Sequence, residues 1–373
     1  MSDRKLYRVI GIMSGSSLDG LDIAEIEFTF TSNPITSNPI ASNPVTSNSL
    51  ESWKLIQAQM FPFPSNILNL FTQATTLPIL SFSRFENQLT EFIGECCKSF
   101  IHSTKYIEVV GCHGHTIWHL PDEHITIQAC NGQMLSTRLS LPVICHFRMK
   151  DVSYGGVGTP MAPLADRDLF AGYRAYLNLG GIANISYKDH QQSWKAFDLI
   201  PCNQVLNHFA QILGQVYDEN GKFAKEGTLS QDLLVFLDNH PYLKSTSPKS
   251  LDNTQVYQDW IQPIEKFYLP PKDVLHTYTH FIASQIQASF LPATGVPKKV
   301  LISGGGGHNK YLISLLNEDE HLIIESTDAD LINYKEAILI GYAAILRYLG
   351  LPNFIHSVTG AISDVSGGDV FHP

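Results

Sequence analysis

The sequence predicts an α/β protein in which mixed β-sheets are flanked by helices. Apolar, strand-like segments alternate with amphipathic, helix-like segments along the whole chain. The first two strand-like segments, Tyr7–Met13 and Ile23–Phe30, are joined by the turn SGSSLDGLD, so they are expected to pair as a hairpin within a mixed sheet. A chain of 373 residues is long for a single core, which predicts two lobes.

The remaining elements follow from the same periodicities. Later strands are expected at Glu51–Phe61, Ile107–Cys112, Thr126–Ala129, Leu141–Cys145, Tyr176–Leu179 and Val300–Ser303. Helices are expected at Ser81–His102, with Ser81 or Ser83 as its N-cap, Gly132–Ser140, Gln204–Leu213, Val274–Phe290 and Lys335–Leu349. We expect an N-terminal lobe of residues 1–136 plus about 350–373, and a C-terminal lobe of residues 137–349.

Residues 31–49 form a five-residue repeat, TSNPI-TSNPI-ASNPV-TSNS. Proline at every fifth position excludes a helix or a central strand. The repeat therefore predicts a flexible and dispensable surface insertion.

Charge and composition exclude several classes of partner. The 25 Lys and Arg residues are outnumbered by 35 Asp and Glu residues, and no basic run is present, so neither nucleic acid nor an anionic membrane is expected to bind. No apolar stretch is long enough for a transmembrane helix, and the N-terminus does not resemble a secretory signal. The six cysteines contain no CxxC pair and are expected to be reduced, buried residues of a cytoplasmic protein.

Three glycine-rich turns each follow a predicted strand. They are Ser14–Gly20, Leu179–Asn184 and Ser303–Asn309. Glycine lets backbone N–H groups approach an anion closely, and the third turn also opens a helix, whose N-terminus favours phosphate. Turns in both halves of the chain predict a nucleotide held between two lobes, and the absence of GxxxxGK[ST] argues against a P-loop fold.

Several carboxylates occupy informative places. Asp19 and Asp22 lie in the first glycine turn, where they are expected to hold Mg²⁺ near phosphate. Asp198 ends an apolar run and suits a general base, and Asp151 precedes a Gly/Pro loop expected to fold over a substrate. Glu336 begins the last helix. The alternative for a lone carboxylate is a solvated surface charge or a helix cap.

His113, His115 and His119 have the spacing HxHxxxH. A zinc site is one interpretation, but no further His or Cys ligand accompanies them, so hydrogen bonding to a polar substrate is favoured. Arg148 is the best candidate to bind a carboxylate or phosphate through bidentate hydrogen bonds from its guanidinium.

At this point the motifs resemble one family, the anhydro-N-acetylmuramic acid kinases. The matching segments are GIMSGSSLDGLD (11–22), CHGHTIWH (112–119), PVICHFRMKDVSYGGVGTPMAPLAD (142–166), LNLGGIANIS (177–186), FDLIPCN (197–203), ISGGGGHN (302–309), KEA (335–337) and SVTGA (357–361). The resemblance covers nearly the whole chain except the TSNP repeat. The chain departs from the family pattern at His146, Val157, Ile200 and Cys202.

The resemblance implies an actin-like ATPase fold, related to ribonuclease H, with the nucleotide in the cleft between two lobes. It also implies a set of site residues. The nucleotide-binding residues would be Gly15, Ser16, Ser17, Leu18, Asp19, Gly20, Leu21, Asp22, Gly180, Gly181, Gly304, Gly305, Gly306 and Gly307. The sugar-binding residues would be His113, Thr116, Arg148, Asp151 and Glu336.

The implied activity is an ATP- and Mg²⁺-dependent reaction of cell-wall recycling. Asp198 would activate a water that opens the 1,6-anhydro ring of anhydro-N-acetylmuramic acid, and the freed O6 would take the γ-phosphate to give N-acetylmuramic acid 6-phosphate. Family members are often dimers, although the sequence itself marks no interface. Two alternatives stay open here: another sugar kinase on the same scaffold, and a non-catalytic ATP-dependent sugar sensor.

Overall fold

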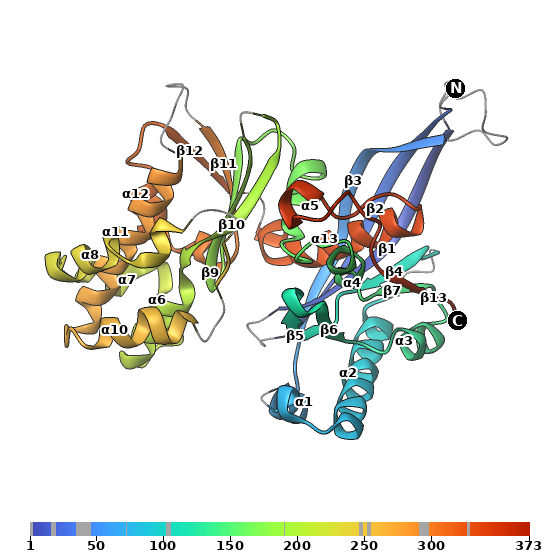
Figure 1. Ribbon diagram of the computed structural model, residues 1–373, viewed down its shortest axis with the longest axis horizontal. Coiled ribbons are helices and arrows are strands. Elements are labelled where there is room, and N and C mark those ends of the chain that lie inside the picture. Colours follow the sequence, from blue (N-terminus) through green and yellow to red (C-terminus); the bar gives the residue numbers. More distant parts are fainter. Residues whose placement is uncertain are drawn as a thin grey trace. The chain divides into compact units, whose positions relative to one another are not determined.

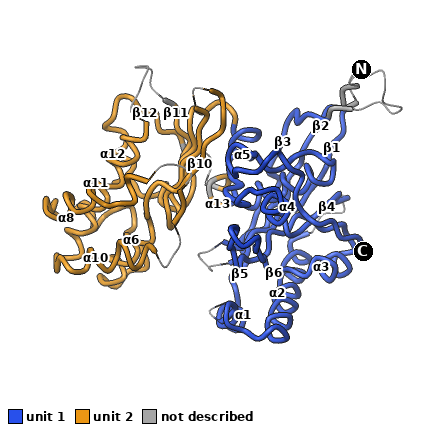
Figure 2. The backbone as a smooth tube through the Cα atoms, viewed as in Figure 1, with its two compact units in different colours: residues 1–170, 334–373 blue, residues 171–333 orange. Residues whose placement is uncertain are grey.

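The computed structural model describes residues 3–15, 20–34, 46–71, 73–101, 106–189, 191–245, 249–251, 255–290, 298–326 and 329–373. The chain forms two compact units (Figure 2): unit 1 comprises residues 1–170 and 334–373, and unit 2 comprises residues 171–333. Each unit contains a mixed sheet with helices beside it (Figure 1), which confirms the predicted α/β class. None of the described helices combines the length and the apolar character that crossing a bilayer requires.

Unit 1 is built on a six-stranded sheet in the order β13-β7-β4-β1-β2-β3, with a separate hairpin of β5 and β6. Its strands are β1 (Asp3–Ser14), β2 (Gly20–Pro34), β3 (Thr46–Pro62), β4 (Val109–Cys112), β5 (His115–Leu120), β6 (Ile125–Ala129), β7 (Val143–Cys145) and β13 (Asp369–Phe371). Its helices are α1 (Ser65–Phe71), α2 (Ile79–Phe100), α3 (Gly132–Leu139), α4 (Arg148–Ser153), α5 (Ala162–Asp168), α13 (Ala329–Tyr348, of which the part from 334 belongs to this unit) and α14 (His356–Thr359).

The alternation of β1 sends its side chains to two different helical layers. Ile10 and Ile12 are fully buried in one core cluster with Phe85 and the other apolar residues of α2. Gly11 faces the opposite way, and a Cβ added there would lie 1.9 Å from the carbonyl oxygen of Ala337 in α13. The backbones of β1 and α13 are therefore in direct contact, which only glycine permits.

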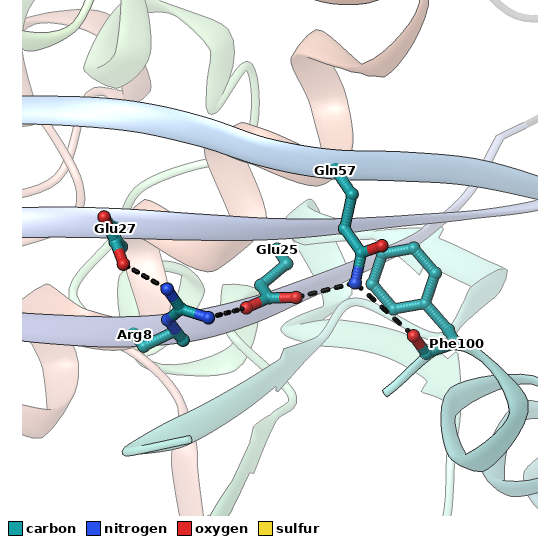
Figure 3. Close-up of polar contacts among 5 residues, drawn as sticks. All are labelled: Arg8, Glu25, Glu27, Gln57 and Phe100. Carbon is teal, nitrogen blue, oxygen red and sulfur yellow. Dashed lines mark hydrogen bonds and ion pairs between the residues drawn. The ribbon is translucent and has the colours of Figure 1, made fainter. Parts of the chain in front are cut away.

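A buried ion-pair cluster joins the first three strands (Figure 3). Arg8 on β1 donates from Nη1 to Glu25 Oε1 on β2 at 2.7 Å and from Nη2 to Glu27 Oε1. Gln57 on β3 donates from Nε2 to the other Glu25 oxygen at 2.7 Å and to the Phe100 carbonyl at 3.4 Å. The side chains of Arg8 and Glu25 are only 9% and 1% exposed, so each needs the other to offset the cost of leaving water.

Unit 2 is built on a five-stranded sheet in the order β10-β9-β8-β11-β12. The strands are β8 (Ala175–Leu179), β9 (Ile182–Lys188), β10 (Trp194–Pro201), β11 (Lys298–Ser303) and β12 (Leu322–Ser326). The helices are α6 (Asn203–Ile212), α7 (Lys222–Glu226), α8 (Gln231–Asp238), the π-helical turn η5 (Val256–Ile261), α10 (Gln262–Glu265), α11 (Pro271–Phe290) and α12 (Lys310–Leu316). Short 3₁₀ turns stand at η3 (Glu219–Gly221), η4 (Pro241–Lys244) and η6 (Gly305–His308). The core is centred on α11, which is buried along most of its length.

The TSNP repeat is not wholly a loop, which corrects the prediction for its two ends. β2 extends to Pro34 and β3 begins at Thr46, and these two residues are opposite each other in the hairpin. The Thr31 and Ser49 hydroxyls hydrogen bond across it at 2.9 Å. Proline is tolerated where a strand ends because the missing N–H disrupts no inner ladder. Residues 35–45 lie outside the described residues.

The predicted N-cap of α2 was wrong. Neither Ser81 nor Ser83 caps α2, since the helix begins at Ile79 after Pro78, and the Ser83 hydroxyl donates back to the Ile79 carbonyl.

The lobe boundaries also differ from those predicted. Residues 137–170 and 334–349, expected in the C-terminal lobe, belong to unit 1. The reason is that β7 pairs with β4 and so adds a strand to the sheet of unit 1, whereas α13 packs on β1 and so covers a face of that sheet.

Candidate active site

A row of polar residues crosses the sheet of unit 2 at the carboxyl end of β8. Asp198 on β10 is paired with Asn184 on β9, Asn184 with Asn178 on β8, and Asn178 with Ser303 on β11. Residues directly opposite each other in a sheet face the same side, and neighbouring strands are ~4.8 Å apart. The register therefore connects the predicted base to the residue that precedes Gly304. Asn178 and Asn184 were not predicted, although both lie within the LNLGGIAN motif.

Asp198 is held at a bulge by the segment that follows α8. The strand register shifts between Asp198 and Ile200, a distortion common beside active sites. The N–H of Leu251 donates to Asp198 Oδ2 at 3.0 Å, and the Tyr242 hydroxyl donates to the Asp198 carbonyl at 2.8 Å. Oδ1 has no hydrogen-bond partner among the described residues. Burial raises the pKa of Asp198 to about 6, and the bond from Leu251 opposes this rise.

These properties suit a general base. A carboxyl group with a pKa near 6 is mostly ionised at neutral pH and is still basic enough to accept a proton efficiently. The oxygen bonded to Leu251 fixes the orientation of the group, while Oδ1 stays available.

The third glycine turn packs tightly on the end of β8. Gly304 has φ of +81°, and a Cβ added there would lie 2.4 Å from Asn178 Oδ1 and 2.8 Å from the carbonyl carbon of Leu179. A Cβ on Gly306 would lie 2.7 Å from Leu179 Cβ. Glycine is thus required twice for close approach of two chain segments.

The second glycine turn meets the third through Asn203. The carbonyls of Gly181 and Gly180 accept hydrogen bonds from the N–H groups of Cys202 (2.8 Å) and Asn203 (3.1 Å), which close the start of α6. Asn203 Nδ2 also donates to the Leu179 carbonyl at 2.9 Å. Two of the three predicted turns therefore lie together in unit 2, as expected of a phosphate-binding surface.

In unit 1, His113 presents a buried acceptor without a partner. The side chain is 3% exposed, and burial, assisted by the Arg148 charge, lowers its pKa to about 3, so the ring is neutral. Nδ1 lies 3.0 Å from the Gly114 carbonyl and must carry the proton to bond with it. Nε2 is therefore a lone-pair acceptor, and it has no hydrogen-bond partner within the described ranges. A ligand hydroxyl or N–H group would satisfy it.

Arg148 presents a complementary donor. It begins α4, and its Nε is buried with no hydrogen-bond partner in the part of the chain that the structure describes. Burial lowers the pKa of Arg148 to about 10, against the opposing charge of Glu336 on α13, so the guanidinium remains cationic at neutral pH. The structure thus brings together His113, Arg148 and Glu336, three of the five predicted sugar-binding residues. Thr116 lies nearby in sequence on β5, opposite Gln128.

Asp151 has partners within the protein, and its predicted contact with a sugar stays a prediction. It is fully buried, and its two carboxylate oxygens accept hydrogen bonds from the Gly158 N–H and the Thr359 hydroxyl, both at 2.8 Å. Burial raises its pKa, and the two bonds oppose the rise. With both oxygens used inside the protein, Asp151 is a structural neighbour of the site.

The first glycine turn is described only at its two ends. Ser14 Oγ lies 3.0 Å from His115 Nδ1, and Gly20 packs against Met60 and Phe61. Leu21 carries its side chain into the core, so only its backbone could reach a nucleotide. The predicted residues Ser16, Ser17, Leu18 and Asp19 lie outside the described residues.

The structure places the predicted metal ligand Asp22 at the start of β2, half-buried and opposite Met13. A carboxylate here fits Mg²⁺, which is commonly bound by one or two protein carboxylates together with substrate phosphates. Among the residues described, no three His, Cys, Asp or Glu side chains are arranged to hold a metal ion, which gives the zinc alternative no support.

His146, one of the departures from the family pattern, is turned toward the C-terminal strand. It has φ of +54°, and its Nδ1 and Nε2 lie 3.1 Å from Asp369 Oδ2 and 3.2 Å from the Cys130 carbonyl. Its ring also contacts Phe371 edge-on. Both nitrogens are engaged within unit 1, so His146 supports the segment before Arg148.

Comparisons with known proteins identify the family of this chain. The family model described as anhydro-N-acetylmuramic acid kinase matches residues 7–373. The protein of that name from Methylorubrum populi is 32% identical over 387 residues, covering 99% of this chain and 100% of the relative. The protein of that name from Haemophilus influenzae is 28% identical over 401 residues, covering 100% of this chain and 99% of the relative.

Among solved structures, component A of the (R)-2-hydroxyglutaryl-CoA dehydratase of Acidaminococcus fermentans is 12% identical, covering 91% of this chain and 97% of that chain. Its TM-score is 0.41, too low to bear on fold or activity.

Mixed sheets, paired glycine turns and a half-buried carboxyl group with a raised pKa are features that fit a phosphotransferase site. The match over residues 7–373 makes the assignment specific: the chain belongs to the anhydro-N-acetylmuramic acid kinase family.

Proposed function

We propose that this chain is an ATP- and Mg²⁺-dependent kinase that opens 1,6-anhydro-N-acetylmuramic acid and phosphorylates O6, giving N-acetylmuramic acid 6-phosphate. The observation that carries the proposal is Asp198, a half-buried carboxyl group whose pKa is raised to about 6. One of its oxygens has no hydrogen-bond partner among the described residues, and a polar row leads from it to Gly304. Family membership supplies the identity of the sugar.

The residues of unit 1 supply the groups that such a sugar needs. Arg148 offers a positive charge to the lactyl carboxylate, together with a buried Nε donor that has no partner among the residues the structure describes. His113 Nε2 offers an acceptor to a hydroxyl or amide N–H. Glu336 adds a second acceptor at an exposed position within α13, which begins at Ala329 and not, as predicted, beside Glu336. A ligand with one carboxylate and several hydroxyl and amide groups matches this set.

The residues of unit 2 supply the base and the phosphate-binding amides. Asp198 Oδ1 would take a proton from the water that attacks the anomeric carbon, and the bond from that carbon to O6 would break. O6 would then attack the γ-phosphorus of ATP, the bond to the bridging oxygen would break and ADP would leave. The phosphates would be held by the backbone of Gly304–Gly307 and of the first hairpin turn. Mg²⁺, bound by Asp22 and Asp19, would neutralise phosphate charge.

We place the reaction in the cytoplasm. All six cysteines are free and buried, as expected in a reducing compartment, and ATP is the phosphoryl donor.

Product analysis in isotopic water tests the proposal. The protein is incubated with ATP, Mg²⁺ and anhydro-N-acetylmuramic acid in H₂¹⁸O, and the products are followed by mass spectrometry and ³¹P NMR. We expect a phosphomonoester at O6 and a solvent oxygen at C1. A phosphorylated product that keeps its anhydro bridge would instead identify a plain sugar kinase, and ATP-dependent sugar binding without phosphoryl transfer would identify a sensor.

A further inference from the structure

The glycine loop, defined as residues 155–158, lies beside the sugar-binding side chains of unit 1. A Cβ added to Gly158 would lie 3.1 Å from Arg148 Cβ and 3.5 Å from His119 Cε1. Gly155 has open space around it, and Val157 is exposed. The loop therefore presents one surface to solvent next to Arg148.

Asp151 holds this loop from the inside. Its Oδ2 accepts the Gly158 N–H at 2.8 Å, and its backbone carbonyl accepts the Gly156 N–H at 2.9 Å. The contact is close enough that a Cβ on Gly156 would lie 2.2 Å from Oδ2. The loop is thus folded around Asp151 and hydrogen bonded to it at two points.

Thr359 completes the arrangement from a distant part of the chain. Its hydroxyl donates to Asp151 Oδ1 at 2.8 Å, and its carbonyl accepts the Val157 N–H at 2.9 Å. Thr359 is 3% exposed. Thr359 therefore orients both the Asp151 carboxylate and the glycine loop.

His119 contacts the loop from the other side. Its Nδ1 lies 3.0 Å from the Thr126 hydroxyl, which also accepts from Gln128 Nε2 at 2.8 Å. The His119 side chain also hydrogen bonds with the Val157 backbone. Val157 is consequently bonded on both sides, to Thr359 and to His119.

We propose that Asp151 and Thr359 are positioning residues that hold the glycine loop in the shape that completes the sugar pocket beside Arg148. This inference rests on the proposed function for its substrate, and it gives Asp151 a role other than direct sugar contact. A misplacement of ~1 Å in a binding wall can reduce the rate of an enzyme by ~100-fold, so a fixed loop has a measurable effect.

Thr359→Val tests the proposal, because valine keeps the shape of threonine and removes only the hydroxyl. We expect the KM for the sugar to rise ~10-fold or more while the KM for ATP stays within ~2-fold, because one binding wall is displaced. Thr359→Ser retains the hydroxyl and should restore the sugar KM. Ser153→Ala is the matched control, since Ser153 is exposed on α4 and its hydroxyl donates to the Met149 carbonyl within the same helix.

Hydrogen exchange of the free protein provides a second readout that needs no substrate. The N–H groups of Val157 and Gly158 lose their fixed acceptors if the loop is released, so a peptide covering 154–161 should exchange faster in Thr359→Val than in Thr359→Ser or Ser153→Ala. Unchanged exchange together with an unchanged sugar KM would overturn the proposal, as would equal increases in both KM values. If the wild-type protein fails to phosphorylate the sugar but exchange still rises, the proposed function is wrong and the positioning role stands.

Discussion

Replacing Asp198 by asparagine separates the chemical role of this side chain from its structural one. Asparagine keeps an oxygen that can accept the Leu251 N–H, so the bond at 3.0 Å need not be lost. What disappears is the ability to take a proton. General-base catalysis contributes ~10²- to 10⁴-fold to a rate, and we expect kcat to fall by that amount with nucleotide affinity unchanged.

The same substitution should stabilise the protein, because the native Asp198 is held in a site that disfavours its charge. Raising its pKa from 3.8 to about 6 corresponds to an upper limit of about 3 kcal/mol. The sign follows from linkage: the folded protein binds the proton more tightly than the unfolded chain, so stability is lost as pH rises from 3.8 through 6 and the full penalty is present at pH 7. Asparagine carries no charge and escapes this penalty.

Two measurements check these expectations together. Urea denaturation at pH 7 should show a free energy of unfolding that is higher in the variant, and the difference should shrink toward pH 4. The wild-type kcat/KM for the sugar should fall ~10-fold per pH unit below an apparent pKa of about 6. If the variant keeps wild-type turnover, the carboxylate is not the base. If the variant loses stability, the carboxylate is not a destabilising charge. Either result refutes the reasoning.

Three further outcomes are expected. Arg8→Met should lower the free energy of unfolding by ~3–5 kcal/mol, because it leaves the buried Glu25 carboxylate without its cation. Arg4→Met, which removes an exposed ion pair, should lower it by only ~0–1 kcal/mol in the same urea titration. Equal effects of the two substitutions would contradict this explanation. Gly11→Ala should lower the thermal midpoint sharply or abolish soluble expression, because its Cβ would meet the Ala337 carbonyl oxygen at 1.9 Å, and a midpoint equal to that of the wild type would show that the contact is not tight. Replacing residues 35–45 by Asn-Gly should leave kcat and both KM values within ~2-fold, because a two-residue turn can join the paired ends of the hairpin; a large loss of activity would show that the repeat takes part in function.

Patterns within single elements were predictable from the sequence. Tyr7–Met13 and Ile23–Phe30 lie within β1 and β2, and the helix expected at Val274–Phe290 lies within α11, because their periodicity reflects burial on one or both sides. The role of Asp198 as a residue held in a semi-buried place was also predictable from its apolar neighbours.

Relations between distant segments were not predictable in this way. The partners of Asp151 depend on Thr359, 208 residues away, so local sequence could not distinguish a structural carboxylate from a sugar ligand. Asn178 and Asn184 gained their importance from strand register, which appears only once β8, β9 and β10 are paired. The unit boundary was misplaced for the same reason, since α13 packs on a sheet whose first strand lies at the other end of the chain.

The division of the chain has a consequence for its biosynthesis. Unit 2 is one continuous stretch, whereas the sheet of unit 1 lacks a helical layer until the final segment, 334–373, has been made. The chain leaves and re-enters unit 1 at neighbouring points, with Lys335 Nζ 5.4 Å from the ring centre of Phe170. On the ribosome, therefore, unit 2 can bury its core before α13 has been made, while the face of the unit 1 sheet around Gly11 is still uncovered. A nascent chain arrested before this helix would expose that face to aggregation and to chaperones.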